Sequence, residues 1–215
     1  MYKIGKNAGK KWMAAVMAAL VTVAAAAGCG KTDKAGAEER KERNSITVAA
    51  SSDTGSMDPA GSIALTYLTY SVSALDELLT FDADGEIDYR AAESYEVNED
   101  STVWTFHLRE EAVWSDGTPV TSADFLNTMT RALDPKSGSG YANYLFPIRN
   151  AEAIYNGEME SGELGVETPD DYTLIFYLEK PCVYFLDLLR LPVYTPSCST
   201  YAKETGSGWD TDPKT

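Results

Sequence analysis

Residues 103–133 read VWTFHLREEAVWSDGTPVTSADFLNTMTRAL and contain a strand, a turn and a helix in succession. In the first seven residues the large apolar side chains alternate with polar ones, so that Trp104, Phe106 and Leu108 share one face. This alternation is typical of an antiparallel strand with one buried face. The pair Asp116-Gly117 favours a tight turn. The sequence therefore predicts a half-buried antiparallel strand followed by a turn.

A helix is predicted directly after that turn. Thr121, with Asp124 three residues later, resembles a helix N-cap with an acid in the first turn, where negative charge is favourable. The apolar residues that follow recur at helical spacing and predict one buried face: Phe125, Leu126, Met129 and Leu133. Asp134-Pro135 should end the helix, because the residue before a proline disfavours helical backbone.

The other predicted elements are also mixed. Strands are predicted at Ser45–Ala50 and Tyr172–Leu178, and turns at Asp84-Gly85 and Pro169-Asp170-Asp171. Helices are predicted through the apolar series Leu68, Val72, Leu75 and Leu79, and at Cys182–Leu191 after Pro181. Because strands with antiparallel signals are interspersed with helices, the core is predicted to be α/β or α+β.

The N-terminal residues predict export. Lys3, Lys6, Lys10 and Lys11 precede an uncharged, alanine-rich stretch, Trp12–Ala27. This stretch is too short to span a hydrocarbon core of roughly 30 Å comfortably, and the pattern is typical of a secretory signal. Ala26-Ala27-Gly28 then lead into Cys29, which resembles the lipobox of bacterial lipoproteins, although position 26 is not the usual leucine. The resemblance implies cleavage after Gly28 and a diacylglycerol on Cys29. An ordinary signal peptide with a chance cysteine and an uncleaved anchor are the alternatives.

The charge of the chain excludes some functions. Gly30–Asn44 has no large apolar residue and predicts a flexible tether between the lipid site and the folded part. The formal charge is −15, and loss of the four signal lysines would take it to −19. Such a charge argues against nucleic-acid binding, which requires clustered Lys and Arg.

Cysteine and histidine content limits the chemistry further. In an exported protein Cys182 and Cys198 could form a disulfide, but separate buried thiols are the preferred interpretation. His107 is the only histidine, and it lies on the polar face of a predicted strand with no evident nucleophile beside it. No His or Cys residues stand at zinc-ligand spacing, and the acidic residues are too dispersed for a calcium loop. Neither a metal nor another cofactor is expected.

Several ordered segments carry a family resemblance. They are Ala92–Val97 (AESYEV), Trp104–Arg109 (WTFHLR), Trp114–Thr121 (WSDGTPVT) with Asp124-Phe125, Asp134-Pro135, Ser139–Leu145 (SGYANYL), Glu163–Val166 (ELGV) and Trp209–Lys214 (WDTDPK). In this order they resemble the solute-binding proteins of family 5, the extracellular receptors of peptide-importing ABC transporters. The similarity extends over Ile46–Lys214, and the SGYANYL and ELGV segments are most similar to the oligopeptide-binding branch.

The resemblance implies an α/β fold of the periplasmic-binding-protein-like type II. Such proteins have two lobes, with a small mixed α+β domain inserted in lobe I. On this basis residues 46–75 and 199–215 are expected to form part of lobe I, and residues 76–198 the inserted domain. Residues 1–28 are the expected signal peptide, and 29–45 the lipidated cysteine and tether. The chain is then expected to carry roughly the first two-fifths of such a receptor, without the second lobe.

The resemblance also proposes ligand contacts. Tyr141 matches a family tyrosine that reaches from the inserted domain into the peptide cleft, and packing of its loop is the alternative role. Ile63 and Leu65 stand where the family places contacts of lobe I, and simple helix packing is their alternative. At Ile63 the oligopeptide branch can carry an acid, which this sequence lacks.

The expected function is therefore a lipid-anchored receptor on the outer face of the cytoplasmic membrane. It would bind oligopeptides and deliver them to the permease subunits of an ABC importer, without catalysing a reaction. The same fold could bind a dipeptide, a nickel chelate or an oligosaccharide instead. An exported hydrolase and a purely structural surface lipoprotein are the alternatives from other classes.

Overall fold

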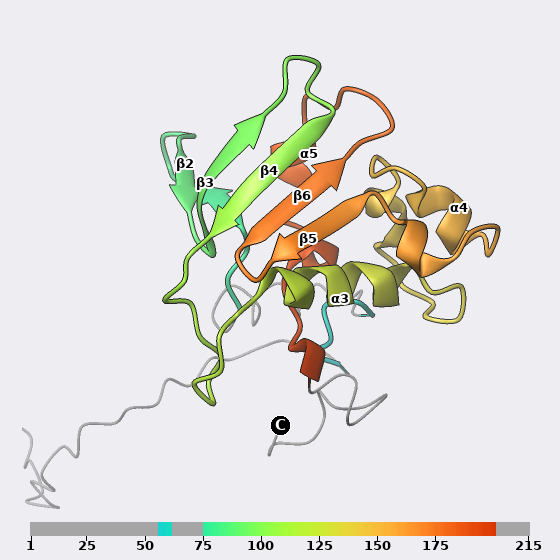
Figure 1. Cartoon of the computed structure of the whole chain (residues 1–215), viewed down its shortest axis with the longest axis horizontal. Helices are drawn as coiled ribbons and strands as arrows, with labels where there is room; N and C mark the ends of the chain where they lie inside the picture. The colour runs from blue at the N-terminus through green and yellow to red at the C-terminus, as the bar shows by residue number, and fades with distance from the viewer. Residues whose placement is uncertain (1–55, 62–74, 201–215) are drawn as a thin grey trace, which may run out of the picture. The chain divides into compact units, whose positions relative to one another are not determined.

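The computed structural model describes residues 56–61 and 75–200 (Figure 1). Internal contacts divide the chain into two units, Met1–Val48 and Ala49–Thr215, and every described residue belongs to the second. The strand predicted at Ser45–Ala50 lies outside the described residues.

The centre of the fold is a four-stranded antiparallel sheet. Its strands are β3 (Ala92–Val97), β4 (Val103–Leu108), β5 (Val166–Asp170) and β6 (Thr173–Tyr177), in the order β3-β4-β6-β5 (Figure 1). Trp104 of β4 pairs with Phe176 of β6, and Phe106 pairs with Leu174. All four side chains are buried, as the alternation in β4 predicted. A separate two-stranded hairpin joins β1 (Leu79–Phe81) to β2 (Ile87–Tyr89) around the predicted turn at Asp84-Gly85, where Gly85 has a φ of 84°.

Aromatic side chains cover the buried face of the sheet. Phe185, in the short helix α5 (Phe185–Leu188), packs its ring 5.3 Å from that of Phe176 and 5.5 Å from that of Trp104, centroid to centroid. Tyr194, in the 3-10 helix η3 (Pro192–Tyr194), lies 6.1 Å from Phe185. Aromatic rings bury large apolar areas and favour such tilted contacts, so this cluster stabilises the sheet from one side.

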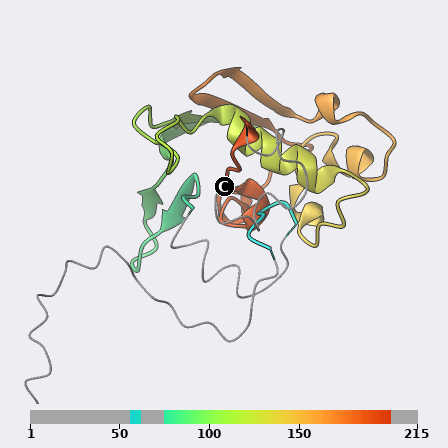
Figure 2. The ribbon, with the colours of Figure 1, turned by 90° about the horizontal axis from the view of Figure 1, so that it is seen from below.

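Helix α3 (Ser122–Leu133) lies beside β5 and η3 (Figures 1 and 2). It begins after Thr121 and ends before Asp134, as the sequence predicts. Phe125, Met129 and Leu133 are fully buried. The predicted helix therefore forms, and its expected face is buried except at Leu126, which is only half-buried.

Short helices connect α3 to β5. They are η1 (Ala142–Leu145), α4 (Ala151–Tyr155) and η2 (Ser161–Glu163). Gly165, directly before β5, lies so close to Arg149 and Tyr177 that a Cβ atom there would be 2.7 Å from the Arg149 Cβ and 2.8 Å from the Tyr177 carbonyl oxygen. The Glu-Leu-Gly-Val segment therefore has a packing reason for its glycine.

Three predicted elements need correction. The helix predicted through Leu68, Val72, Leu75 and Leu79 does not include its last two residues. Leu75 lies in irregular backbone, and Leu79 lies in strand β1, where it pairs with Tyr89. Leu68 and Val72 lie outside the described residues. Here strand pairing outweighs a helical spacing of leucines. Pro169 and Asp170 belong to β5 rather than to a turn, since an edge strand tolerates a proline.

The third correction concerns the chain after Pro181. A helix was predicted over Cys182–Leu191, but only the four residues of α5 are α-helical. Pro192 restricts the residue before it to extended backbone, and Leu191 has a ψ of 150°. The chain therefore leaves α5 and continues as η3 instead of one longer helix.

Candidate ligand-binding site

Tyr141 is the one ligand-contact candidate within the described residues. It stands at the N-terminal end of η1, is half-buried, and packs against the core. Its ring centroid lies 5.8 Å from that of Tyr144. No hydrogen bond within the described part of the chain involves its hydroxyl group. The ring is thus held by packing against Tyr144 and the core.

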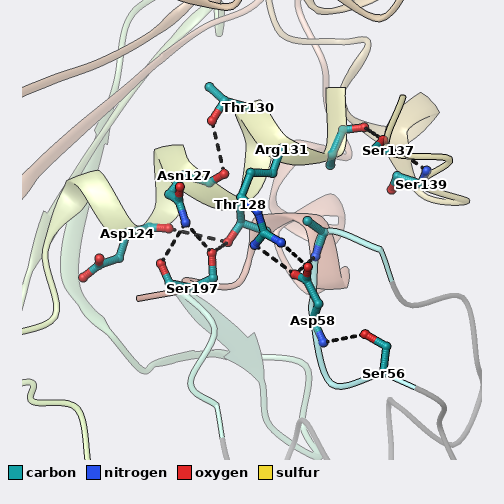
Figure 3. Close-up of polar contacts among 12 residues, drawn as sticks. Ser56, Asp58, Asp124, Asn127, Thr128, Thr130, Arg131, Ser137, Ser139 and Ser197 are labelled. Atoms are coloured by element: carbon teal, nitrogen blue, oxygen red, sulfur yellow. Dashed lines mark hydrogen bonds and ion pairs between the residues drawn. The ribbon is translucent and has the colours of Figure 1, made fainter. Parts of the chain in front are cut away.

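The loop before Tyr141 is tied to the end of α3. The Ser137 hydroxyl donates to the Ala132 carbonyl oxygen over 3.0 Å, and its oxygen accepts the Ser139 N–H over 3.2 Å (Figure 3). The Ser139 hydroxyl is buried and has no hydrogen-bond partner among residues 56–61 and 75–200. A buried polar group without a partner is unfavourable, so the loop holds this group next to Tyr141 at a cost in stability.

Tyr194 fixes η1 from the core side. Its hydroxyl donates to the Tyr144 carbonyl oxygen over 2.9 Å. Burial is the main reason why the pKa of Tyr194 is far above its usual value, and nearby Cys182 and Tyr184 raise it further. The hydroxyl therefore stays protonated and remains a donor. Together with the Ser137 contacts, this hydrogen bond holds the backbone around Tyr141 from two sides.

The Trp-Ser-Asp-Gly-Thr-Pro-Val-Thr segment converges on Asp124 of α3. Asp124 Oδ2 accepts the Thr121 N–H at 2.9 Å, the Thr121 hydroxyl at 3.3 Å and the Trp114 indole N–H at 3.1 Å. Asp124 Oδ1 accepts the Ser199 N–H at 2.7 Å. The side chain is only 3% exposed. This motif therefore has a structural role, and its carboxylate is fully engaged in holding the fold.

The turn of this segment is held by a second carboxylate. Asp116 Oδ1 accepts the N–H of Thr118 at 2.8 Å and its hydroxyl at 2.7 Å. These hydrogen bonds to Thr118 lower the pKa of Asp116. Gly117 has a φ of 88°, which confirms the predicted tight turn.

Comparison with known proteins identifies the family. The family model described as the middle part of bacterial extracellular solute-binding proteins, family 5, matches residues 86–215. The periplasmic oligopeptide-binding protein OppA of Escherichia coli (strain K12) is 36% identical over 199 residues, covering 92% of this chain and 35% of that protein. The chain belongs to this family.

Solved family 5 structures confirm the fold. The structure of Haemophilus influenzae OppA in complex with RPPGFSPFR has a TM-score of 0.70 and 34% identity, over 74% of this chain and 31% of that one. The predicted α/β, periplasmic-binding-protein-like fold, present in part, is thereby confirmed. The curated relatives also include the probable deoxycholate-binding periplasmic protein YgiS of Escherichia coli (strain K12), 34% identical over 74% of this chain and 30% of that protein. The chain spans about a third of the length of the curated relatives it matches.

The structure does not describe the other site residues that the sequence of this family 5 chain proposes. Ile63, Leu65 and Cys29 are outside the described residues. Two clefts in the described part have volumes of about 270 and 240 Å³, and neither is lined by Tyr141. The larger lies beside α4, and the smaller lies between Leu75, the end of β4 and Pro196. Of the ligand contacts proposed from the sequence, Tyr141 alone lies within the described residues.

His107 lies in strand β4, where Thr173 of β6 and Ser94 of β3 are its neighbours across the sheet. Ser94 of β3 lies opposite His107 in the sheet, but no hydrogen bond joins them in the described part of the chain. Asp170 accepts hydrogen bonds from the Tyr172 N–H and the Thr173 hydroxyl. These bonds lower the pKa of Asp170, with a minor contribution from His107. A Ser-His-acid relay requires a hydrogen bond between serine and histidine, and the described residues show none between Ser94 and His107.

The described residues contain two cysteines, Cys182 and Cys198. They are separate free thiols, as expected, but only Cys182 is buried and Cys198 is half-buried. Within residues 56–61 and 75–200, no group of three or more His, Cys, Asp and Glu side chains is arranged to hold a metal. In the same residues no helix has the length and apolar character needed to cross a membrane.

An ion pair that no sequence pattern predicted lies at the end of α3. Arg131 of α3 contacts the carboxylate of Asp58, in the segment 56–61 (Figure 3). Asp58-Pro59 could have indicated a turn, but no local signal indicates a partner more than seventy residues away.

Proposed function

We propose that this chain is part of an extracellular receptor that binds oligopeptides, with Tyr141 as a ligand contact. The observation that carries the proposal is the geometry of Tyr141. Its ring is packed against Tyr144 and its loop is held at both ends, while its hydroxyl has no partner among the described residues. The family and the oligopeptide-binding relative support the choice of ligand.

A tyrosine in this position suits a peptide ligand. An extended peptide presents repeated N–H and C=O groups, and receptors often bind it as they would an added strand. The flat ring can lie along the peptide chain, and the hydroxyl can donate to or accept from its backbone. Because the contact is to groups that all peptides share, Tyr141 would contribute affinity without selecting a particular sequence.

The remaining parts of the receptor follow from the family resemblance. Residues 46–75 and 199–215 would belong to lobe I, with Ile63 and Leu65 as further contacts, and residues 76–198 would form the inserted domain. A second lobe would close over the peptide, and the closed form would dock on the permease subunits of an ABC importer. Acylation at Cys29 would hold the receptor on the outer face of the cytoplasmic membrane.

A different ligand class is the second candidate. One relative carries the name of a probable deoxycholate-binding protein at 34% identity, so the same fold is associated with more than one ligand name. Bile acids lack the repeated N–H groups of a peptide. A dipeptide, a nickel chelate or an oligosaccharide would also be distinguished by direct binding measurements.

The test is a calorimetric titration of the full-length, lipid-free protein. Separate titrations use a pool of tri- to pentapeptides, a dipeptide pool and deoxycholate. We expect saturable binding of the tri- to pentapeptides and no release of cleavage products. Binding of deoxycholate alone would replace the proposal with the second candidate, and peptide cleavage would identify a hydrolase.

A further inference from the structure

Two segments far apart in the sequence are joined through the side chain of Arg131. Arg131 Nη1 lies 3.1 Å from Asp58 Oδ1, and Arg131 Nη2 contacts Asp58 Oδ2, so both carboxylate oxygens are engaged (Figure 3). The side chains are only 28% and 15% exposed. A two-pronged guanidinium–carboxylate contact fixes orientation as well as distance, and partial burial reduces its screening by salt.

The segment on the Asp58 side of the pair is itself ordered. Ser56 Oγ accepts the Asp58 N–H at 3.0 Å, Asp58 Oδ1 accepts the Ala60 N–H at 3.0 Å, and the Asp58 carbonyl oxygen accepts the Gly61 N–H at 3.2 Å. Pro59 and Ala60 are buried. The carboxylate of Asp58 therefore links a compact turn to α3, and movement of Asp58 would move the whole turn.

The segment on the Arg131 side leads to Tyr141. Arg131 stands in the last turn of α3, and the Ser137 hydroxyl donates to the carbonyl oxygen of the neighbouring Ala132. The loop that begins there continues through Ser139 to Tyr141. The end of α3 therefore has two attachments, one to the turn at Asp58 and one to the loop that presents Tyr141.

We propose that the Asp58–Arg131 pair positions Tyr141 relative to lobe I. The proposal rests on the proposed function, in which Asp58 belongs to lobe I, and Arg131 and Tyr141 belong to the inserted domain. The pair then connects two parts of the receptor that must contact the same ligand. A lysine at position 131 would keep the charge but lose the planar two-pronged contact, so it separates orientation from simple attraction.

A second contact supports α3 as the junction. The Ser197 hydroxyl oxygen accepts from the Asn127 amide and from the Thr128 hydroxyl, each at 2.9 Å (Figure 3). Ser197 lies two residues before the segment that we assign to the return into lobe I. One helix thus contacts the chain at the end of the inserted domain and, through Arg131, the turn at Asp58 in the segment assigned to lobe I.

The experiment compares R131K and D58N with wild type in the full-length protein, and uses D88N as the matched control. Asp88 forms an ion pair with Arg90 at 2.7 Å, but those side chains are 45% and 47% exposed. Affinity for tripeptides to pentapeptides is measured by calorimetry and corrected for the folded fraction. We expect it to fall about fivefold or more in R131K and D58N and to stay unchanged in D88N.

A second readout requires no ligand. Hydrogen exchange of the amides in residues 137–145 should be faster in R131K and D58N than in wild type, while exchange in the sheet strands stays the same. Unchanged exchange in residues 137–145 together with unchanged affinity per folded molecule would overturn the positioning role. If the wild-type protein binds no peptide, the proposed function fails, and the exchange measurement still decides whether the ion pair orders the Tyr141 loop.

Discussion

Replacement of Asp124 by alanine should destabilise the fold more than any other single change in the Trp114–Asp124 segment. Its carboxylate accepts hydrogen bonds from the Thr121 N–H and hydroxyl, the Trp114 indole and the Ser199 N–H. The substitution leaves these donors without their acceptor, at a site where Asp124 is only 3% exposed. It also removes the acid that caps α3.

The magnitude follows from the number of donors. Loss of a helix cap costs about 1 kcal/mol, and a hydrogen bond to a charged group contributes about 1.5–3 kcal/mol. Trp114, Thr121 and Ser199 are all half-buried, so water can partly replace each of these contacts. We therefore expect D124A to lower the free energy of unfolding by about 3 kcal/mol, less than the sum for fully buried donors. D124N retains one acceptor oxygen and should lose about half as much.

Urea unfolding monitored by tryptophan fluorescence measures this loss, since Trp114 itself donates to Asp124. The matched control is D116A, which removes an exposed carboxylate from the same segment and should have a clearly smaller effect. An unfolding midpoint for D124A equal to that of D116A would refute the assignment of Asp124 as the centre of the motif.

Three further substitutions give separate tests. G165A should cost about 2 kcal/mol, because the new Cβ would lie 2.8 Å from the Tyr177 carbonyl oxygen, and urea unfolding measures this. Y194F should cost about 1 kcal/mol by removing the donor to the Tyr144 carbonyl oxygen, with the same loss in melts at neutral and mildly alkaline pH. Burial raises the pKa of Glu77 above its ordinary value of 4.5. The stability of the protein therefore falls as the pH rises from 4.5 through the pKa of Glu77 in the folded state. Because E77Q removes this ionisation, it should raise the melting temperature at neutral pH but not below about pH 4.

Each of these has a result that would contradict it. For the glycine, G162A is the control, because a Cβ at Gly162 would meet no atom within 4 Å; equal losses for the two variants would exclude the steric explanation. For Tyr194, a loss that disappears at alkaline pH would mean that the hydroxyl ionises. For Glu77, a destabilising E77Q at neutral pH would show that attraction to Arg190 and Arg90 outweighs burial.

The central sheet and α3 could be predicted from local sequence patterns. In β4 the alternation of Trp104, Phe106 and Leu108 alone shows which face is buried, and the structure agrees. The limits of α3 follow from Thr121 and Asp134 because capping and proline effects act within a few residues. Such features depend on neighbours in sequence, so they are readable without the fold.

Features that depend on distant partners could not be predicted in this way. Leu79 forms a strand because β2 is available for pairing, and nothing in the local spacing of leucines shows this. The contact between Asp58 and Arg131 joins residues that only the fold brings together. For the candidate site, the family resemblance proposed Tyr141, and the structure adds the contacts that hold it, from Ser137 and Tyr194.

The role of Tyr141 in peptide binding is tested most directly by the peptide affinity of the Y141F variant. The full-length protein is titrated calorimetrically with the tightest-binding tri- to pentapeptide, beside Y89F, which removes the hydroxyl of another half-buried tyrosine. A neutral hydrogen bond contributes about 0.5–1.5 kcal/mol, so we predict an affinity about two- to thirteenfold weaker for Y141F and unchanged for Y89F. Equal affinities of Y141F, Y89F and wild type would contradict a hydrogen bond from Tyr141 to the ligand.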